Sequence, residues 1–104
     1  MTNYYENLDA ILTVYRLNYL KAKQNGDYIE ASSILYDMNS AHPPEAMLED
    51  MPRFSVSKSK WNTSLGVRLD VNRKAKQYCD YWNNKLELAM STFRAQNQEA
   101  YNRI

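Results

Sequence analysis

The sequence is short of the residues on which several protein classes depend. Its 104 residues include two glycines, three prolines, one cysteine and one histidine. Glycine and proline are too rare for the frequent turns of an all-β fold, whereas good helix formers fill the periodic stretches. A single cysteine excludes an internal disulfide. The composition therefore predicts one mainly α-helical domain without covalent cross-links.

Motifs for catalysis and for metal or phosphate binding are also missing. The only histidine, His42, is followed by two prolines and has no serine or cysteine beside it that would complete a nucleophile pair. One histidine and one cysteine do not fill a zinc site without several carboxylates. The two glycines do not form a phosphate-binding loop. We therefore expect no enzyme activity, no metal ligands and no cofactor.

Long apolar runs are absent as well. No run approaches the roughly 18 residues of a membrane span, and the N-terminus lacks the basic-then-apolar order of a signal peptide. We expect a protein that stays out of the membrane and works in the cytoplasm. In that compartment Cys79 is expected to be a reduced core residue.

The most informative pattern is an apolar stripe in the last third of the chain. Its members recur every three or four residues, which predicts one face of a long helix over 71–103; they are Ala75, Cys79, Trp82, Leu86, Ala89, Phe93, Ala100 and Ile104. Such a helix is about 50 Å long, whereas a compact domain of this size has a radius of gyration of about 13 Å. The helix is therefore expected to extend beyond its own domain and to offer surface to a partner.

The first 40 residues predict an antiparallel helical hairpin over 4–40. Asn3 and Glu6 form a capping box, and Asn25-Gly26 is a left-handed helix end. The apolar face of this first helix is Tyr5, Leu8, Leu12, Tyr15, Tyr19 and Ala22, joined by Ile11 and Leu20. A second helix is expected to start after Asp27 and to end before His42, and the short link makes the two helices antiparallel.

Residues 41–70 are expected to connect the hairpin to the long helix. Pro44 starts one further turn and Pro52 stops it. The alternation of Phe54, Val56, Val67, Leu69 and Val71 is typical of a short β-hairpin within 53–70. A second interpretation is that the helical register continues backwards through Trp61, Leu65, Leu69 and Asn72, with Gly66 inside the helix. We favour an irregular connector and Asp70 as the N-cap of the long helix.

Charge is distributed unevenly although the net charge is only +1. Residues 1–51 contain three basic and eight acidic residues, whereas residues 52–80 contain seven basic and two acidic residues. The chain is therefore polarised into an acidic hairpin and a basic segment.

Two functional hypotheses follow from these patterns. The first is a macromolecule-binding protein, most simply a homodimer that binds another protein as an adaptor, assembly factor or inhibitor. A chain of this size without a catalytic set also suits an accessory factor of a phage or plasmid. A second row of aromatic and aliphatic residues on the long helix supports this hypothesis. The candidate contact residues are Tyr78, Tyr81, Trp82, Leu88 and Phe93.

The alternative is a nucleic-acid-binding protein that uses the basic segment 53–76. Lysine and arginine neutralise phosphates, and the candidates are Arg53, Lys58, Lys60, Arg68, Arg73, Lys74 and Lys76. Domains dedicated to nucleic acid usually have an isoelectric point above about 9, whereas this chain has one of about 7.8. The sequence therefore favours the protein-binding hypothesis.

Overall fold

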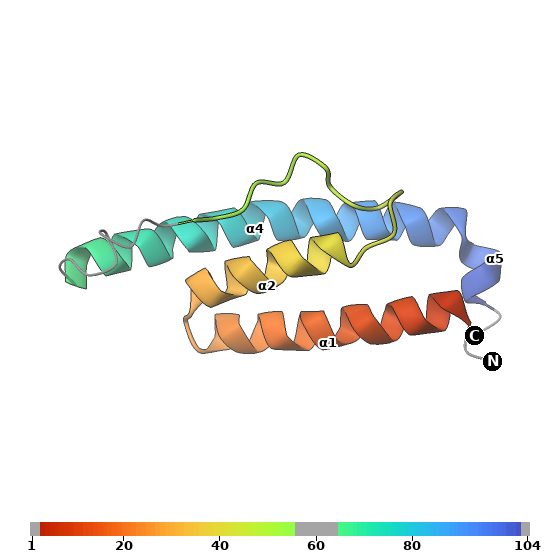
Figure 1. The fold of residues 1–104 in the computed structure, drawn as a ribbon, viewed down its shortest axis with the longest axis horizontal. Helices are drawn as coiled ribbons and strands as arrows, with labels where there is room; N and C mark the ends of the chain where they lie inside the picture. Colours follow the sequence, from red (N-terminus) through yellow and green to blue (C-terminus); the bar gives the residue numbers. More distant parts are fainter. Residues whose placement is uncertain (1–2, 56–64, 103–104) are drawn as a thin grey trace.

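The fold is a helical hairpin packed against one long helix (Figure 1). The computed structural model describes residues 3–55 and 65–102. The described helices are α1 (Tyr4–Gln24), α2 (Tyr28–Ser40), α4 (Leu65–Gln96) and α5 (Gln98–Tyr101). These ranges contain no strand. The predicted mainly α fold class is confirmed.

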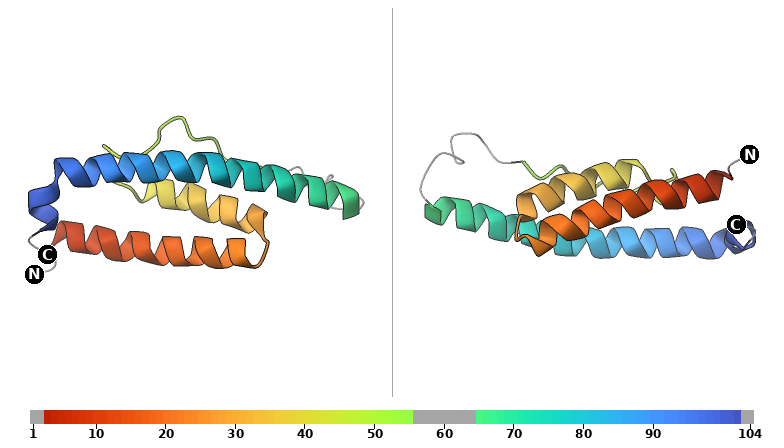
Figure 2. Two further views of the ribbon diagram at one scale, coloured as in Figure 1. Left: turned by 180° about the vertical axis from the view of Figure 1, so that it is seen from behind. Right: turned by 90° about the horizontal axis from the view of Figure 1, so that it is seen from below.

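The three longer helices run side by side along the length of the molecule, and α2 packs against both α1 and α4 (Figure 2). The molecule measures 53 × 23 × 18 Å and its radius of gyration is 15.9 Å, above the value of about 13 Å for a compact domain of this length. The start of α4 projects past the turn between α1 and α2 (Figure 1). The part of the long helix that overhangs is its N-terminal end, which lies before residue 71, where the sequence predicts the helix to start.

Local capping interactions set the ends of the hairpin helices. The backbone N–H of Tyr5 donates to the Asn3 side chain at 2.7 Å, and that of Glu30 donates to Asp27 at 3.0 Å. Between the helices Gly26 adopts a φ of 74°, a conformation that costs any residue with a Cβ. Asn3 and Asp27 are confirmed as N-caps, and the left-handed turn at Gly26 is confirmed. The Asn3 side chain accepts from Tyr5, and Glu6 does not complete the predicted capping box in the described structure.

The core lies where the apolar faces of α1, α2 and α4 meet. Its most deeply buried large side chains are Tyr19, Leu35 and Leu86. The predicted stripe on the long helix is buried at Ala75, Cys79, Leu86 and Phe93, and Trp82 and Ala89 are partly buried. The predicted face of α1 is wrong at Ile11 and Leu20, which are exposed. Both residues lie off the narrow strip of α1 that its neighbours cover.

The long helix begins earlier than predicted. It starts at Leu65, so Asp70 is an interior residue that pairs with Arg73 and Lys74, and its predicted role as N-cap is wrong. Val67, Leu69 and Val71 are helical, and the β-hairpin prediction is therefore wrong for them. The helical register therefore continues backwards through Leu69 to Leu65, and Gly66 lies in the first turn of the described helix. Val56 and Trp61 lie outside the described residues.

The long helix also ends earlier than predicted, at Gln96, and a short helix follows. The Asn97 side chain donates to the carbonyl of Phe93 at 2.8 Å, so it competes with the backbone for a helical acceptor. The Tyr5 hydroxyl donates to Asn97 at 3.2 Å, and the rings of Tyr5 and Tyr101 meet at 4.9 Å. These contacts turn the chain towards the start of α1.

Two asparagine side chains fix the long segments to the hairpin. The buried Asn39 donates to the carbonyl of Leu48 and accepts from its N–H, both at 2.8 Å. Asn72 of α4 donates to the carbonyl of Gly26 and accepts from the N–H of Tyr28, both at 3.0 Å. The first holds the turn after α2, and the second attaches α4 to the α1–α2 turn. Val71 beside Asn72 is still buried, and the start of α4 before it projects beyond the hairpin (Figure 1).

Candidate protein-contact face

The outer face of α4 presents two large apolar side chains to solvent. Tyr81 is 54% exposed and Leu88, two turns further on, is 70% exposed. Between them Lys85 places its Nζ 4.7 Å from the centre of the Tyr81 ring and 5.3 Å from that of Trp82. A hydrogen bond with the Tyr81 side chain raises the pKa of Lys85. We call Tyr81, Lys85 and Leu88 the α4 patch; it combines apolar area with one positive charge.

Trp82 links the α4 patch to the core. Its ring meets that of Tyr81 edge to face, with centres 4.9 Å apart and planes at 86°. The same ring lies 6.4 Å from that of Tyr78 and packs against the buried cluster. Tyr81 is therefore supported by a partly buried neighbour, which reduces the entropy that it loses on contact with a partner.

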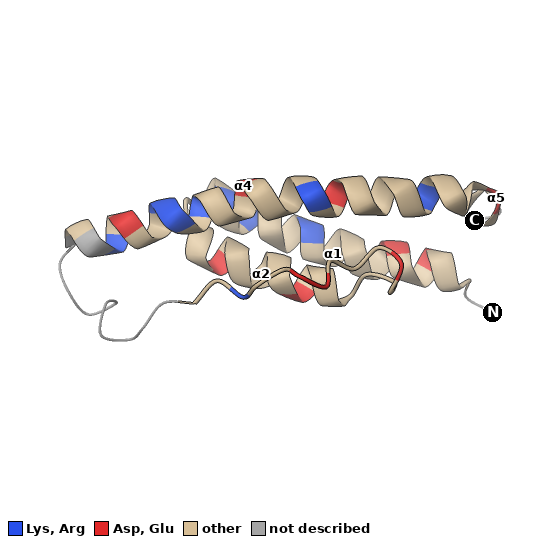
Figure 3. Ribbon diagram, turned by 90° about the horizontal axis from the view of Figure 1, so that it is seen from above, with Lys and Arg blue, Asp and Glu red and all other residues tan. Residues whose placement is uncertain are grey.

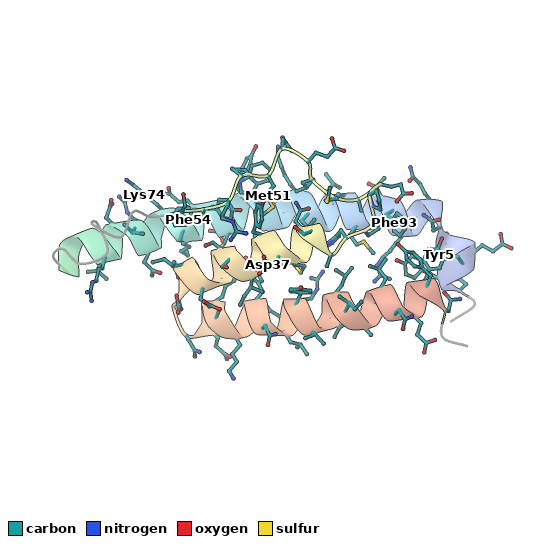
Figure 4. The ribbon with its side chains drawn as sticks, viewed as in Figure 1. Tyr5, Asp37, Met51, Phe54, Lys74 and Phe93 are labelled. Atoms are coloured by element: carbon teal, nitrogen blue, oxygen red, sulfur yellow. The ribbon has the colours of Figure 1, made fainter. Side chains whose placement is uncertain are left out.

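Tyr78 is covered by the chain's own connector. Its hydroxyl donates to the carbonyl of Pro52 at 2.5 Å, and its ring lies 5.6 Å from that of Phe54. Burial raises the pKa of Tyr78 to about 12. Met51 is buried in the core, and Figure 4 shows it and Phe54 lying along α4. The connector therefore covers Tyr78, which belongs to the second row of aromatic and aliphatic residues on the long helix that was expected to contact a partner.

Phe93 is also a core residue rather than a contact residue. It is buried at the end of the molecule where Tyr5 and Tyr101 enclose it, with ring centres 6.2 and 6.3 Å away (Figure 4). Among the five protein-contact candidates, Tyr81 and Leu88 are well exposed, Tyr78 and Trp82 are partly buried, and Phe93 is buried. The helical spacing correctly placed all five residues on one helix, but it did not distinguish buried positions from exposed ones.

Four basic residues of the alternative hypothesis, Arg68, Arg73, Lys74 and Lys76, lie in the N-terminal half of α4, where Figure 3 shows several basic segments. Arg73 and Lys74 both pair with Asp70, and their hydrogen bonds lower the pKa of that carboxyl group, Arg73 contributing most. Lys76 lies 4.0 Å from Asp80. These lysines and arginines are exposed, but neighbouring carboxylates partly neutralise them.

The remaining basic candidates do not extend that cluster in the described structure. Arg53 stacks over the Tyr36 ring at 4.4 Å. Arg68 is exposed, whereas Lys58 and Lys60 lie outside the described residues. The structure therefore brings Arg68, Arg73, Lys74 and Lys76 together on one stretch of helix and places Arg53 separately, on the connector.

A second exposed apolar surface, on α1, was missed by the sequence analysis. Ile11, Val14, Leu17 and Leu20 are 50, 59, 62 and 49% exposed. They recur every three residues, which winds them around the side of α1 away from the core. Arg16, within this stretch, pairs with Glu87 of α4, and Asp9, just before it, pairs with Arg94. The signal in the sequence that could have revealed this surface was the long interval without charged residues on the outer side of α1.

His42 and the acidic residues show no arrangement typical of catalysis. His42 is buried, and its Nδ1 donates to the Met38 carbonyl at 2.7 Å, which places it at the end of α2. Burial lowers the pKa of His42. An open groove between α1 and α2 of about 380 Å³ carries Lys21, Asp27 and Glu30. Within residues 3–55 and 65–102, no three acidic, histidine or cysteine residues are placed to hold a metal ion.

Comparison with known proteins adds no relative. No protein family, curated protein sequence or solved structure matches this chain. Among the described helices, none combines the length and the apolar character needed to cross a membrane.

Proposed function

We propose that this chain is a protein-binding module, acting as an adaptor, assembly factor or inhibitor, and that it works as a homodimer. The observation that carries the proposal is the α4 patch, where Tyr81 and Leu88 stand exposed on a rigid helix beside Lys85. Tyrosine provides a large contact area at a low entropic cost and is enriched at interfaces. The cytoplasmic location expected from the sequence stays a prediction.

The charge arrangement favours a protein partner over nucleic acid. Asp70 lies among the basic side chains at the start of α4 and pairs with Arg73 and Lys74. A phosphate backbone approaching that surface would meet the carboxylate as well as the two cations. Arg53 is already stacked on Tyr36. Because non-specific DNA binding depends on many free cationic contacts, the described surface supports that alternative less well.

Affinity capture with matched variants tests the proposal. The tagged chain is used to capture partners from lysate of its source cells, with and without nuclease, beside Leu88→Glu and a control, Ser91→Glu. Both variants add one charge to an exposed position of α4, but only the first alters the patch. We expect a protein that survives nuclease, is retained by Ser91→Glu and is reduced at least about tenfold by Leu88→Glu, as for a central contact.

Two results would contradict the proposed role of the patch. One is recovery that depends entirely on nucleic acid, which would favour the basic-segment alternative. The other is equal capture by Leu88→Glu and wild type. Far-ultraviolet circular dichroism of each variant controls for folding.

A further inference from the structure

We infer that the uncovered side of α1 pairs with α1 of a second copy of this chain, in an antiparallel arrangement about a two-fold axis between Thr13 and Val14. This inference adopts the homodimer of the proposed function and assigns its interface. It leaves the α4 patch free for a different protein.

The first support is the surface itself. With 3.6 residues per turn, Ala10, Val14 and Leu17 lie near the middle of the outer side of α1, and Ile11 and Leu20 lie on its two flanks. From Asn7 to Leu20 this side is about 20 Å long and carries no charged side chain, because Asp9 and Arg16 turn to α4. Such a contiguous apolar surface on a helix indicates an interaction site.

The second support is charge complementarity at the two ends of this surface. Glu6 precedes it by one residue and Lys21 follows it by one residue, and both side chains are exposed. Neither forms an ion pair within the described part of the chain. In the antiparallel pairing, Glu6 of one copy lies opposite Lys21 of the second copy, and symmetry repeats the pair. A parallel pairing would instead place like charges together.

The third support is steric. The same axis sets the small Ala10 opposite Leu17 of the second copy and Thr13 opposite Val14. Alternation of small and large side chains allows two helices to approach to the usual 8–10 Å between axes. The pairing is isologous, so it closes at two copies.

The sharpest test is a charge swap at the ends of the surface. Glu6→Lys and Lys21→Glu each turn two attractive pairs into two repulsive ones, and we expect each to raise the dimer dissociation constant roughly tenfold. The double variant restores both pairs and is expected to return within about threefold of wild type. Glu6 lies in the first turn of α1 and Lys21 in the last, so the double variant opposes the helix dipole most. Simple loss of helix stability would therefore make the double variant the weakest dimer.

Sedimentation equilibrium over a wide concentration range provides the readout, with Leu17→Glu and Leu88→Glu as a matched pair of exposed leucines on α1 and α4. We expect Leu17→Glu to be monomeric and Leu88→Glu to dimerise like wild type. A wild type that remains monomeric overturns the inference, as does a Leu17→Glu variant that still dimerises or a double variant that is not rescued. If wild type is monomeric but captures a different protein, and Leu17→Glu no longer captures it, the inference is overturned, because that protein rather than a second copy covers this side of α1. None of these results changes the outcome expected for the Leu88→Glu capture experiment. Failure of the proposed α1 interface can therefore be distinguished from failure of the proposed role of the α4 patch.

Discussion

Single polar side chains connect the parts of this small protein. Asn39 and Asn72 each satisfy one backbone donor and one backbone acceptor of a distant segment. Removing such a side chain leaves backbone groups without a partner, which costs about 1–3 kcal/mol where they are buried. No local spacing rule marks these two asparagines among the others, because their partners are fixed only by the tertiary arrangement. The contacts of these two asparagines are therefore not predictable from the sequence alone.

His42 gives the molecule a defined pH dependence. It is the only histidine, and burial lowers its pKa below the usual value of about 6.5. Below that value the unfolded chain takes up a proton that the folded chain does not, so the free energy of unfolding rises with pH in this window. We expect wild type to lose on the order of 1 kcal/mol between about pH 7.5 and about pH 5.5.

Denaturant unfolding of wild type and His42→Gln at these two pH values measures the effect. Glutamine keeps a donor for the Met38 carbonyl but does not titrate. The difference between the two pH values is expected to shrink in the variant. An equal loss in both proteins would show that a group other than His42 is responsible.

The helix α4 separates into an inner and an outer side within a single turn. Leu86 is almost fully buried, whereas Leu88 is 70% exposed. We expect Leu86→Ala to lower the free energy of unfolding by about 2–5 kcal/mol, since it opens a cavity in the core. Leu88→Ala is expected to change it by less than about 0.5 kcal/mol. Urea unfolding of the two variants checks both numbers, and similar losses would mean that the register of α4 is misassigned.

The start and end of α1 could be predicted because capping chemistry is local. The side chain of Asn3 caps α1 through a backbone N–H two residues away, and Gly26 ends the turn after α1 by its positive φ. The start of α2 is equally local, because Asp27 accepts from a backbone N–H three residues away. The start of α4 could not be predicted in the same way. Asp70 resembles an N-cap in the sequence, but in the structure it lies inside the helix and pairs with Arg73 and Lys74. An aspartate followed by basic residues three and four positions later is compatible with an N-cap and with an ion pair inside a helix, so the sequence alone does not distinguish the two.

The candidate contact residues were predicted only in part. Spacing correctly placed Tyr81 and Leu88 on a common side of the last helix, and both are exposed. It did not reveal that residues 51–54 return along α4 and cover Tyr78, because this contact is non-local. On α1, Ile11 and Leu20 were wrongly assigned to the core face, because helical spacing alone does not say how wide a strip the neighbouring helices cover.

Taken together, the helices form an elongated molecule with exposed apolar surface on two of them. The described cations of the basic segment are partly paired within the chain, and the apolar outer side of α1 and the α4 patch are exposed. Under the proposed function, this chain is expected to recognise its partners mainly by apolar contact. Its affinity is therefore expected to depend only weakly on salt, unlike binding to phosphates.

Titration of fluorescent duplex and single-stranded DNA at several salt concentrations tests this central claim most directly. We expect dissociation constants weaker than about 10 μM at near-physiological salt, because Arg73, Lys74 and Lys76 already pair with carboxylates in the described part of the chain. Submicromolar binding with a steep salt dependence would contradict the claim. For about five phosphate contacts, the logarithm of the association constant would fall with the logarithm of the salt concentration at a slope near −4 to −5. If reversal of Lys58, Lys60, Arg73 and Lys74 to glutamate also abolished that binding without unfolding the chain, the basic segment would be the functional site.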